Sequence, residues 1–273
     1  MHLKKTVFLS VFLLLYISGI VSAQRVAIVG AMPVEVEAFR KAMNVTKKTE
    51  RMGFLFYEGT INQTPVVLVR CGIGKVNAAM TAALLMEHYQ PECLLFSGIA
   101  GGVGEKLHAG DLVLGAQVFH HDMGTLKDSG FEHWGVPNPR TGKDNPVLFH
   151  ADRKLLQLAE NTAKSFSFES MSDRGKTRKP AVVSGCIATG DAFVASEDKN
   201  KILKKTFQTI AVDMESASVA QVCFQQGVPF LIIRSISDGA NEDTESAYYE
   251  NKKRSARNAS RFVLELVKSV GKK

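Results

Sequence analysis

The sequence has no linker, internal repeat or low-complexity tract within its 273 residues. Without such a boundary, residues 24–273 are expected to form one domain, because a chain of this length fits a single α/β domain with a sizeable core. The basic tracts 174–179 and 252–254 lack the interleaved aromatic side chains of a nucleic-acid platform. No nucleic-acid partner is therefore expected. The tracts are interpreted as solvated surface, with weak binding to anionic surface glycans as the alternative.

Cysteines are few, and none of their spacings suits a metal ion. The four are Cys71, Cys93, Cys186 and Cys223. No C-x-x-C pair occurs, and each lies in or beside an apolar strand or helix face, so buried thiols are favoured over disulfides. His120-His121-Asp122 has no matching His or carboxylate motif elsewhere, which indicates a polar loop rather than a metal site. Neither a metal nor a cofactor is expected.

A long apolar run occurs once, at Thr6–Val21, after a short basic segment that contains Lys4 and Lys5. The small residues Ser22 and Ala23 complete the pattern of a secretory signal peptide. We therefore expect residues 1–23 to be removed and the protein to be exported to the periplasm or cell envelope. Loss of the two lysines would lower the formal net charge from +7 to +5. An uncleaved anchor is the alternative, although the run is short for a span of about 20 residues.

Apolar strand-like runs alternate with helical patterns after this segment, and several of the runs are apolar on both faces. This alternation predicts a twisted, mixed, mostly parallel β-sheet flanked by helices on both faces. Residues 119–150 hold much Gly, Pro, Asn and His and predict a long loop, of the kind that forms lids or binding segments. The expected strands are 25–30, 53–60, 64–71, 93–97, 111–118, 181–189, 210–213 and 230–238, and the main expected helices are 75–89, 151–165, 215–226 and 246–270.

Carboxylates follow three of the apolar runs. Glu35 lies just beyond the first run, Glu215 ends the segment 210–215, and Asp238 ends the segment 230–238. Parallel strands bring their carboxyl ends to one edge of a sheet, so the three side chains are expected to face one cleft. Taken singly, each could instead be a helix cap or a favourable charge in a first helical turn. Together they indicate bond-breaking chemistry.

Two glycine-rich segments invite a nucleotide-binding interpretation that their spacing does not support. The segment 72–75 lacks the residue count and the final Ser or Thr of a phosphate loop. The glycines of 98–104 miss the dinucleotide-binding spacing. What they still provide is backbone that a ligand can approach closely.

Six segments in order carry a family resemblance. They are 28–36, 71–76, 97–102, 190–194, 211–215 and 234–238. From Arg25 to the C-terminal helix, the chain resembles the methylthioadenosine/S-adenosylhomocysteine nucleosidases of the nucleoside phosphorylase superfamily. The resemblance implies that residues 24–273 form a nucleosidase domain with a nucleoside phosphorylase-like fold. It also implies a homodimer that hydrolyses the N-ribosidic bond of adenine nucleosides without a cofactor, with methylthioadenosine and S-adenosylhomocysteine as the main substrates.

The resemblance assigns roles to the three carboxylates. Asp238 would protonate N7 of the leaving adenine, Glu35 would activate the attacking water, and Glu215 would hold the ribose hydroxyls. These roles agree with elementary chemistry, since adenine leaves poorly until protonated and the transition state is a ribosyl cation. An Asp that acts as an acid at neutral pH needs a raised pKa, which burial could supply.

The remaining implied residues contact the substrate. Phe193 would stack on the base and the Val194 backbone would read its edge. Ile99 stands where many relatives carry a small hydroxylated residue, and Asp213 where Glu is common. The substrate-binding set is Ser237, Phe193, Val194, Met214, Met32, Ile73, Ile99, Ala100, Gly101 and Tyr248. Residues 119–150 form a longer segment than in compact relatives, where the equivalent region closes the 5′ pocket of the neighbouring subunit, so the preferred 5′ substituent stays open.

Two other functions compete with hydrolysis. A purine nucleoside phosphorylase would cleave the same bond with phosphate, but Glu35 occupies the turn where hexameric phosphorylases place a phosphate-binding Arg, and an acid there repels phosphate. An exported protein that binds nucleosides or anionic glycans on the same fold is the second rival. Such a protein would have no need of Glu35, Glu215 and Asp238 together.

Overall fold

The computed structural model describes residues 25–173, 176–241 and 243–271, so the expected signal peptide lies outside the described residues. The helices are α1 Pro33–Ala42, α2 Lys75–Tyr89, α3 Arg153–Ser165, α4 Glu197–Lys205, α5 Ser216–Gln226 and α6 Thr244–Val270. The strands are β1 Val26–Gly30, β2 Asn44–Arg51, β3 Phe54–Ile61, β4 Thr64–Arg70, β5 Cys93–Gly102, β6 Leu112–His120, β7 Gly124–Lys127, β8 Gly130–His133, β9 Phe149–His150, β10 Met171–Asp173, β11 Lys176–Arg178, β12 Val182–Thr189, β13 Thr209–Asp213 and β14 Phe230–Asp238.

A mixed sheet forms the centre of the molecule, in the order β13-β12-β6-β14-β5-β1-β4-β3-β2. The central pairs β14–β5, β5–β1 and β1–β4 are parallel, as the apolar runs predict. β5 also pairs antiparallel with β13, through Gly101 with Val212 and Gly102 with Ala211. This second pairing closes part of the sheet on itself, so the carboxyl ends of β5, β13 and β14 surround one space.

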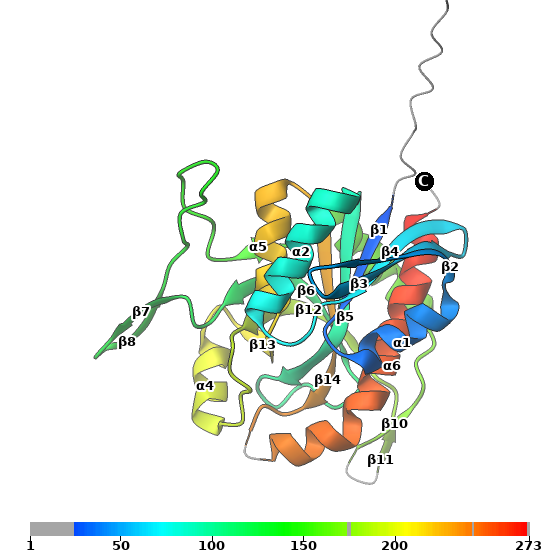
Figure 1. Ribbon diagram of the computed structural model, residues 1–273. Helices are drawn as coiled ribbons and strands as arrows, with labels where there is room; N and C mark the ends of the chain where they lie inside the picture. The colour runs from blue at the N-terminus through cyan, green and yellow to red at the C-terminus, as the bar shows by residue number, and fades with distance from the viewer. Residues whose placement is uncertain (1–24, 174–175, 242, 272–273) are drawn as a thin grey trace, which may run out of the picture.

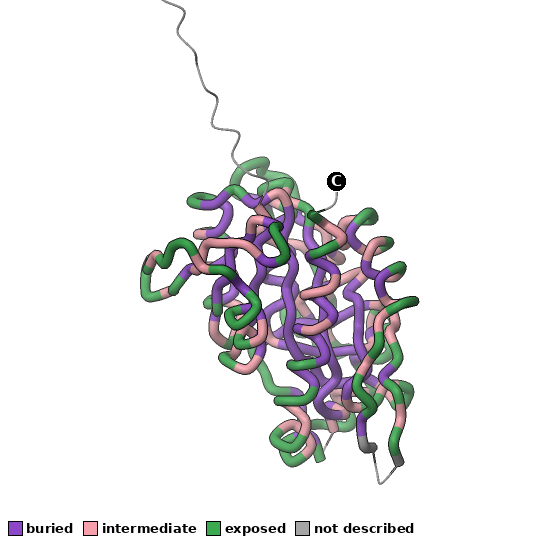
Figure 2. Tube along the Cα trace, turned by 90° about the vertical axis from the view of Figure 1, so that its right-hand side faces the viewer, coloured by how far each residue is buried: buried purple, intermediate pink, exposed green. Residues whose placement is uncertain are grey.

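Helices cover both faces of the sheet, as expected (Figure 1). One buried cluster joins α2 and α5 to the sheet, and a second joins α1, α3 and α6 to its other face. Figure 2 shows buried residues along the central strands, with exposed residues toward the outside of the molecule. The predicted single-domain α/β fold is therefore confirmed for the described residues.

Three expectations about local structure are wrong. β5 continues through Gly102 instead of ending at Ser97, because β14 and β13 supply backbone partners to its glycine segment. The strand β2 was not expected, since its alternation is polar and it lies on the sheet edge. Residues 119–150 are not one continuous loop, because they include the end of β6, the projecting β7–β8 hairpin and β9 (Figure 1).

Cysteine burial follows the prediction. Cys71, Cys186 and Cys223 are buried free thiols, and Cys93 is buried as well. Within the ranges that the structure describes, no helix combines the length and apolar character required to cross a bilayer.

Candidate active site

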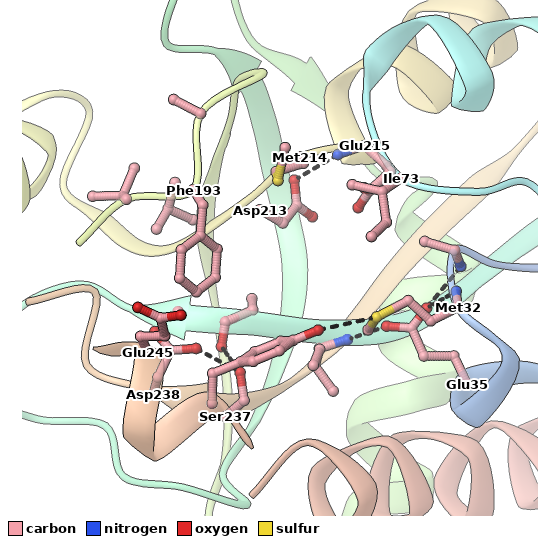
Figure 3. A pocket seen from close by; sticks show the side chains of 18 of the residues that line it. Met32, Glu35, Ile73, Phe193, Asp213, Met214, Glu215, Ser237, Asp238 and Glu245 are labelled. Carbon is pink, nitrogen blue, oxygen red and sulfur yellow. Dashed lines mark hydrogen bonds between the residues drawn. The ribbon is translucent and has the colours of Figure 1, made fainter. Parts of the chain in front are cut away.

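A cavity of about 420 Å³ opens at the carboxyl ends of β1, β5, β13 and β14. Every residue predicted for the site lines this one cavity, as Figure 3 shows for the labelled side chains. The full lining is Ala31, Met32, Glu35, Ile73, Ile99, Ala100, Gly101, Ala192, Phe193, Val194, Val212, Asp213, Met214, Glu215, Ser237, Asp238, Glu245, Tyr248 and Tyr249. The fold therefore brings together segments that are distant in the sequence.

Glu35 lies in the first turn of α1, where Pro33 is the first helical residue. One carboxylate oxygen accepts the backbone N–H groups of Ala31 at 2.7 Å and Met32 at 2.8 Å, and the other accepts that of Ile99 at 2.9 Å. Glu35 thus caps its own helix, which was the alternative role considered for it from the sequence, and it also faces the cavity. Its burial raises the pKa, while the nearby charge of Arg234 opposes that shift.

Glu215 enters the cavity from the turn between β13 and α5. Its Oε1 accepts the backbone N–H of Gly74 at 2.9 Å, and its Oε2 lies 3.6 Å from Nη2 of Arg234. Burial raises the pKa of Glu215 to about 8 against the opposing charge of Arg234. The protonated and ionised forms therefore exchange near neutral pH, so Glu215 can either donate or accept a hydrogen bond at a sugar hydroxyl.

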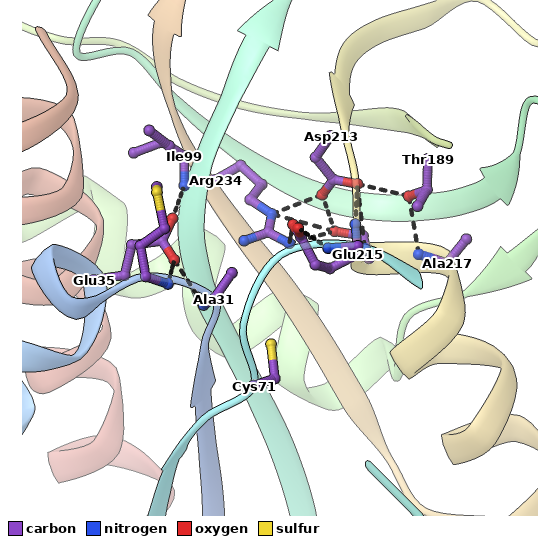
Figure 4. Close-up of polar contacts among 12 residues, drawn as sticks. Ala31, Glu35, Cys71, Ile99, Thr189, Asp213, Glu215, Ala217 and Arg234 are labelled. Atoms are coloured by element: carbon purple, nitrogen blue, oxygen red, sulfur yellow. Dashed lines mark hydrogen bonds and ion pairs between the residues drawn. The ribbon is translucent and has the colours of Figure 1, made fainter. Parts of the chain in front are cut away.

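Arg234 lies behind the cavity wall and forms a buried ion pair with Asp213, which lines the cavity (Figure 4). Nε of Arg234 lies 2.7 Å from Oδ2 of Asp213, and Oδ1 of Asp213 accepts the Thr189 hydroxyl at 2.7 Å. Ser216 also donates its hydroxyl to Asp213. Because Arg234 is fully buried, this carboxylate supplies the charge compensation that a buried guanidinium requires.

Gly98 makes room for this network. A Cβ atom there would lie 1.8 Å from Nη1 of Arg234 and 2.9 Å from Oε1 of Glu35. The glycine segment was expected to admit a ligand, but at this position it admits the guanidinium and a carboxylate of the protein itself.

Asp238 ends β14 at the other end of the cavity from Glu35 (Figure 3). Its Oδ2 accepts the Ser237 hydroxyl at 2.6 Å, and its Oδ1 accepts the backbone N–H of Ala240 at 3.0 Å. Burial raises the pKa of Asp238, although these two hydrogen bonds and one from the Thr244 side chain oppose the shift. A carboxyl group in this setting can retain a proton and donate it to a ligand.

Apolar and aromatic side chains cover the space between the carboxylates. The Phe193 and Tyr248 rings meet edge to face with centroids 5.5 Å apart, and the Tyr248 hydroxyl lies 3.2 Å from Sδ of Met32. Phe193 is half exposed, at 50%, which leaves one side of its ring open to a flat ligand. The cavity thus offers an aromatic surface at the Asp238 end and polar groups near Glu35 and Glu215.

The segment His120-His121-Asp122 was expected to be a polar loop, and only its last two residues lie in a turn, after the end of β6. His120 ends β6, His121 is buried, and Asp122 pairs with Lys75 at 2.7 Å while accepting the Asp191 N–H at 3.1 Å. Burial lowers the pKa of His121 to about 4, so the ring is neutral at pH 7. Across 25–173, 176–241 and 243–271, no group of three or more His, Cys, Asp or Glu side chains is placed to hold a metal ion.

Sequence reasoning missed several contributors to the site. Arg234 had no assigned role, and Asp213 was noted only as a departure from relatives. A signal was present, because an Arg within an otherwise apolar strand must find a buried partner. The cavity lining that was not predicted consists of Ala31, Ala192, Val212, Asp213, Glu245 and Tyr249.

Comparison with known proteins identifies the family of this fold and site. The family model described as the phosphorylase superfamily matches residues 25–268. The chain belongs to this superfamily. It is 34% identical over 247 residues to a 5′-methylthioadenosine/S-adenosylhomocysteine nucleosidase from Bacillus cytotoxicus, covering 90% of this chain and 99% of that protein. A nucleosidase of the same name from Glaesserella parasuis is 36% identical, covering 89% of this chain and 98% of the relative.

Solved structures place the chain in the same family. The Neisseria meningitidis 5′-methylthioadenosine/S-adenosylhomocysteine nucleosidase in complex with methylthio-immucillin-A superposes with a TM-score of 0.79 at 36% identity, covering 90% of this chain and 99% of that one. Futalosine hydrolase of Helicobacter pylori gives a TM-score of 0.77 at 28% identity, covering 90% and 98%. The chain is therefore a member of the methylthioadenosine/S-adenosylhomocysteine nucleosidase family within the phosphorylase superfamily.

Proposed function

We propose that this protein hydrolyses the N-ribosidic bond of adenine nucleosides, releasing adenine and the ribose moiety. The observation that carries the proposal is one cavity with a buried acid, Asp238, at one end and two buried carboxyls, Glu35 and Glu215, around the other. The named relatives are nucleosidases, and the structure similar to this chain from Neisseria meningitidis holds methylthio-immucillin-A. Methylthioadenosine and S-adenosylhomocysteine are accordingly the proposed substrates.

Each carboxyl has a distinct proposed role. Asp238, oriented by Ser237 and Ala240, donates a proton to the leaving purine, while Phe193 stacks on the base. Glu35 accepts a proton from the attacking water, because Oε1 accepts only one backbone N–H and keeps acceptor capacity. Glu215 holds the ribose hydroxyls. The developing ribosyl cation is stabilised by the carboxylates around it.

The charge of the cavity favours water over phosphate as the nucleophile. Besides Glu35, the described lining contains the carboxyl groups of Asp213, Glu215, Asp238 and Glu245, and it contains no Lys or Arg. Arg234 lies behind the wall and is committed to Asp213. A phosphate dianion needs cationic partners, so phosphorolysis has no binding site of the required charge here.

A substrate panel tests the proposal. Protein beginning at Gln24 is assayed for free base from methylthioadenosine, S-adenosylhomocysteine, adenosine, inosine and futalosine, with and without phosphate. We expect adenine from the first two substrates at rates that phosphate does not raise. Absence of base from every substrate would end the enzyme proposal, a strict phosphate requirement would make the protein a phosphorylase, and preferred release from futalosine would move the proposed substrate to that compound.

We also propose that residues 1–23 are a cleaved signal peptide and that the mature domain is periplasmic or in the cell envelope. The match to the family model beginning at residue 25 supports this division. N-terminal sequencing of the protein recovered from the native host's envelope fraction should begin at Gln24, and recovery of an intact Met1 terminus from the cytosol would contradict it.

A homodimer is the proposed assembly. Leu126 on the β7–β8 hairpin is 81% exposed and Trp134 beside it is 42% exposed, so the hairpin presents apolar surface that another copy of the chain could cover. Sedimentation should give twice the mass of the chain, and a mass equal to one chain at micromolar concentration would contradict the proposal.

A further inference from the structure

Asn200 connects three backbone segments through one side chain. It lies in α4, and its amide nitrogen is 2.9 Å from the Gly239 carbonyl oxygen, 3.2 Å from that of Gly102 and 3.4 Å from that of Ala240. Its amide oxygen accepts the backbone N–H of Gly104 at 2.9 Å. The side chain therefore ties α4 to the ends of β5 and β14, which border the cavity.

Two of the residues that Asn200 contacts, Gly239 and Ala240, directly follow Asp238 in the sequence. Ala240 donates its N–H to Oδ1 of Asp238, and its backbone has a φ of +48°. A left-handed conformation is uncommon for alanine and persists only where the surroundings fix it. Ala240 is fully buried, and its carbonyl is one of those that Asn200 contacts. Asn200 thus holds the backbone that orients the Asp238 carboxyl.

We propose that Asn200 is a positioning residue for the proton donor, fixing the Asp238 carboxyl through the 239–240 backbone. This inference rests on the proposed function, because Asp238 needs a fixed orientation only if it delivers a proton to the leaving purine. The Ser237 hydroxyl holds one oxygen of Asp238 and the Ala240 N–H holds the other. The Ala240 contact depends on a segment that lies outside the sheet, and that segment is the one that Asn200 secures.

The anchoring of α4 does not itself require Asn200. The helix has its own N-cap, since the Ser196 hydroxyl accepts the Lys199 N–H, and Leu203 packs into a buried cluster with Val194, Val212 and Ala240. Asparagine is also a weak helix former. Its amide is directed at the 102–104 and 239–240 backbone, so the geometry points to a role in holding that backbone rather than in forming the helix.

Two variants and one control test the proposal. Asn200→Asp keeps the size and the acceptor for Gly104 but places carboxylate oxygen beside three carbonyls, and Asn200→Leu removes every polar contact. Ser196→Ala removes the N-cap of the same helix without touching the 239–240 backbone. kcat and KM are measured with methylthioadenosine for these variants and the wild type, below the melting temperature of each.

We expect both Asn200 variants to lose about 10-fold to 100-fold in kcat, as displacement of a catalytic group by about 1 Å does, with KM changed less than about threefold. The control should stay within about twofold of wild type. Equal kcat in the Asn200 variants and the control would overturn the proposal, as would a loss confined to KM. A wild type that releases no base would instead refute the proposed function, so the two failures are distinct.

Discussion

Asp238 and Glu35 are both buried carboxyls, but they differ in what occupies their oxygens. Glu35 accepts three backbone N–H groups, whereas Asp238 accepts one backbone N–H, the Ser237 hydroxyl and a side-chain hydrogen bond from Thr244. Each of these hydrogen bonds favours the ionised form and opposes the rise in pKa that burial causes at both carboxyls. At Glu35, the proposed base, the charge of Arg234 also opposes that rise.

Removal of the proposed acid tests the role of Asp238. Asp238→Asn keeps the shape but cannot donate a proton as a carboxylic acid does, so kcat for methylthioadenosine should fall about 100-fold to 10,000-fold. Release of adenine is followed by chromatography. Asp243→Asn makes the same chemical change at an exposed residue of the next turn and should leave kcat within about twofold. An Asp238→Asn protein with wild-type turnover would refute the assignment.

The raised pKa of Glu215 should make the free energy of unfolding depend on pH. Because the folded-state pKa of about 8 is above the unfolded value, folding takes up a proton, and the associated stability is present at low pH and lost as pH rises through 8. Glu215→Gln removes this dependence. In urea titrations, its free energy of unfolding relative to wild type should rise by more than about 1 kcal/mol between pH 6 and pH 9.

The control for that titration is Glu250→Gln, an exposed residue of α6. Its difference from wild type should not vary over the same pH interval. A difference for Glu215→Gln that is equally flat would show that Glu215 is ionised throughout.

The carboxylates were predictable from the sequence because each follows an apolar run, and topology alone brings such positions together. Arg234 and Asp213 were not, because the sequence shows two charges without showing that they meet, or that Gly98 leaves room for the guanidinium. The cavity residue Glu245 was missed for a related reason. Nothing in the sequence distinguishes an acid in the first turn of α6 that faces a cavity from one that faces solvent.

At the scale of secondary structure, β14 and β13 are held together by a charge rather than only by apolar packing. Arg234 on β14 reaches Asp213 at the end of β13 and the Ser216 hydroxyl at the start of α5. The guanidinium also lies 4.0 Å from the centroid of the Phe96 ring on β5. Three strands and a helix around the cavity therefore share one buried cation.

Loss of this cation should be costly. Arg234→Met leaves Asp213 buried without its partner, so the free energy of unfolding should fall by about 3 to 5 kcal/mol in urea denaturation. Arg257→Met removes an exposed arginine of α6 whose ion pair with Glu169 is 3.7 Å long, and it should change stability by less than about 1 kcal/mol. If the two variants lost similar amounts of unfolding free energy, the buried pair of Arg234 and Asp213 would not have the proposed effect on stability.

Element boundaries followed the sequence where apolar periodicity was strong and departed where it was weak. α2 and the β3–β4 hairpin match their predicted ranges closely. β2 was not predicted from the sequence, because it lacks an apolar pattern and carries the charged side chains Lys47, Lys48 and Arg51, which are typical of an edge strand. β5 extends through glycines that, read alone, indicate a turn, and only the partner strands make them a strand.

For the whole molecule, the closing pair β5–β13 decides where the cavity forms. An open α/β sheet was sufficient to predict a crevice at the strand ends. The pairing of Gly101 with Val212 narrows that crevice from one side and places Asp238 opposite the Asp213–Glu215 segment. Long-range closure of this kind depends on strand curvature, which local sequence patterns do not encode.

The β7–β8 hairpin supplies a prediction about assembly. Leu126→Asp places a charge on the most exposed apolar side chain of the hairpin, so a dimer that covers it should dissociate at least about tenfold more readily in sedimentation experiments. Ser129→Asp adds the same charge at the hairpin turn and should leave the dimer intact. Identical dissociation constants for the two variants would place the interface elsewhere.

The full enclosure of Arg234 has a consequence for the surroundings in which this protein works. Mobile ions screen charges that water can reach, and they have little effect on charges sealed inside the fold. Salt should therefore weaken the electric field of Arg234 and its carboxylate partners much less than it weakens attractions between exposed charges. Turnover should accordingly depend only weakly on salt concentration, even where surface attractions such as that between Lys75 and Asp122 are weakened.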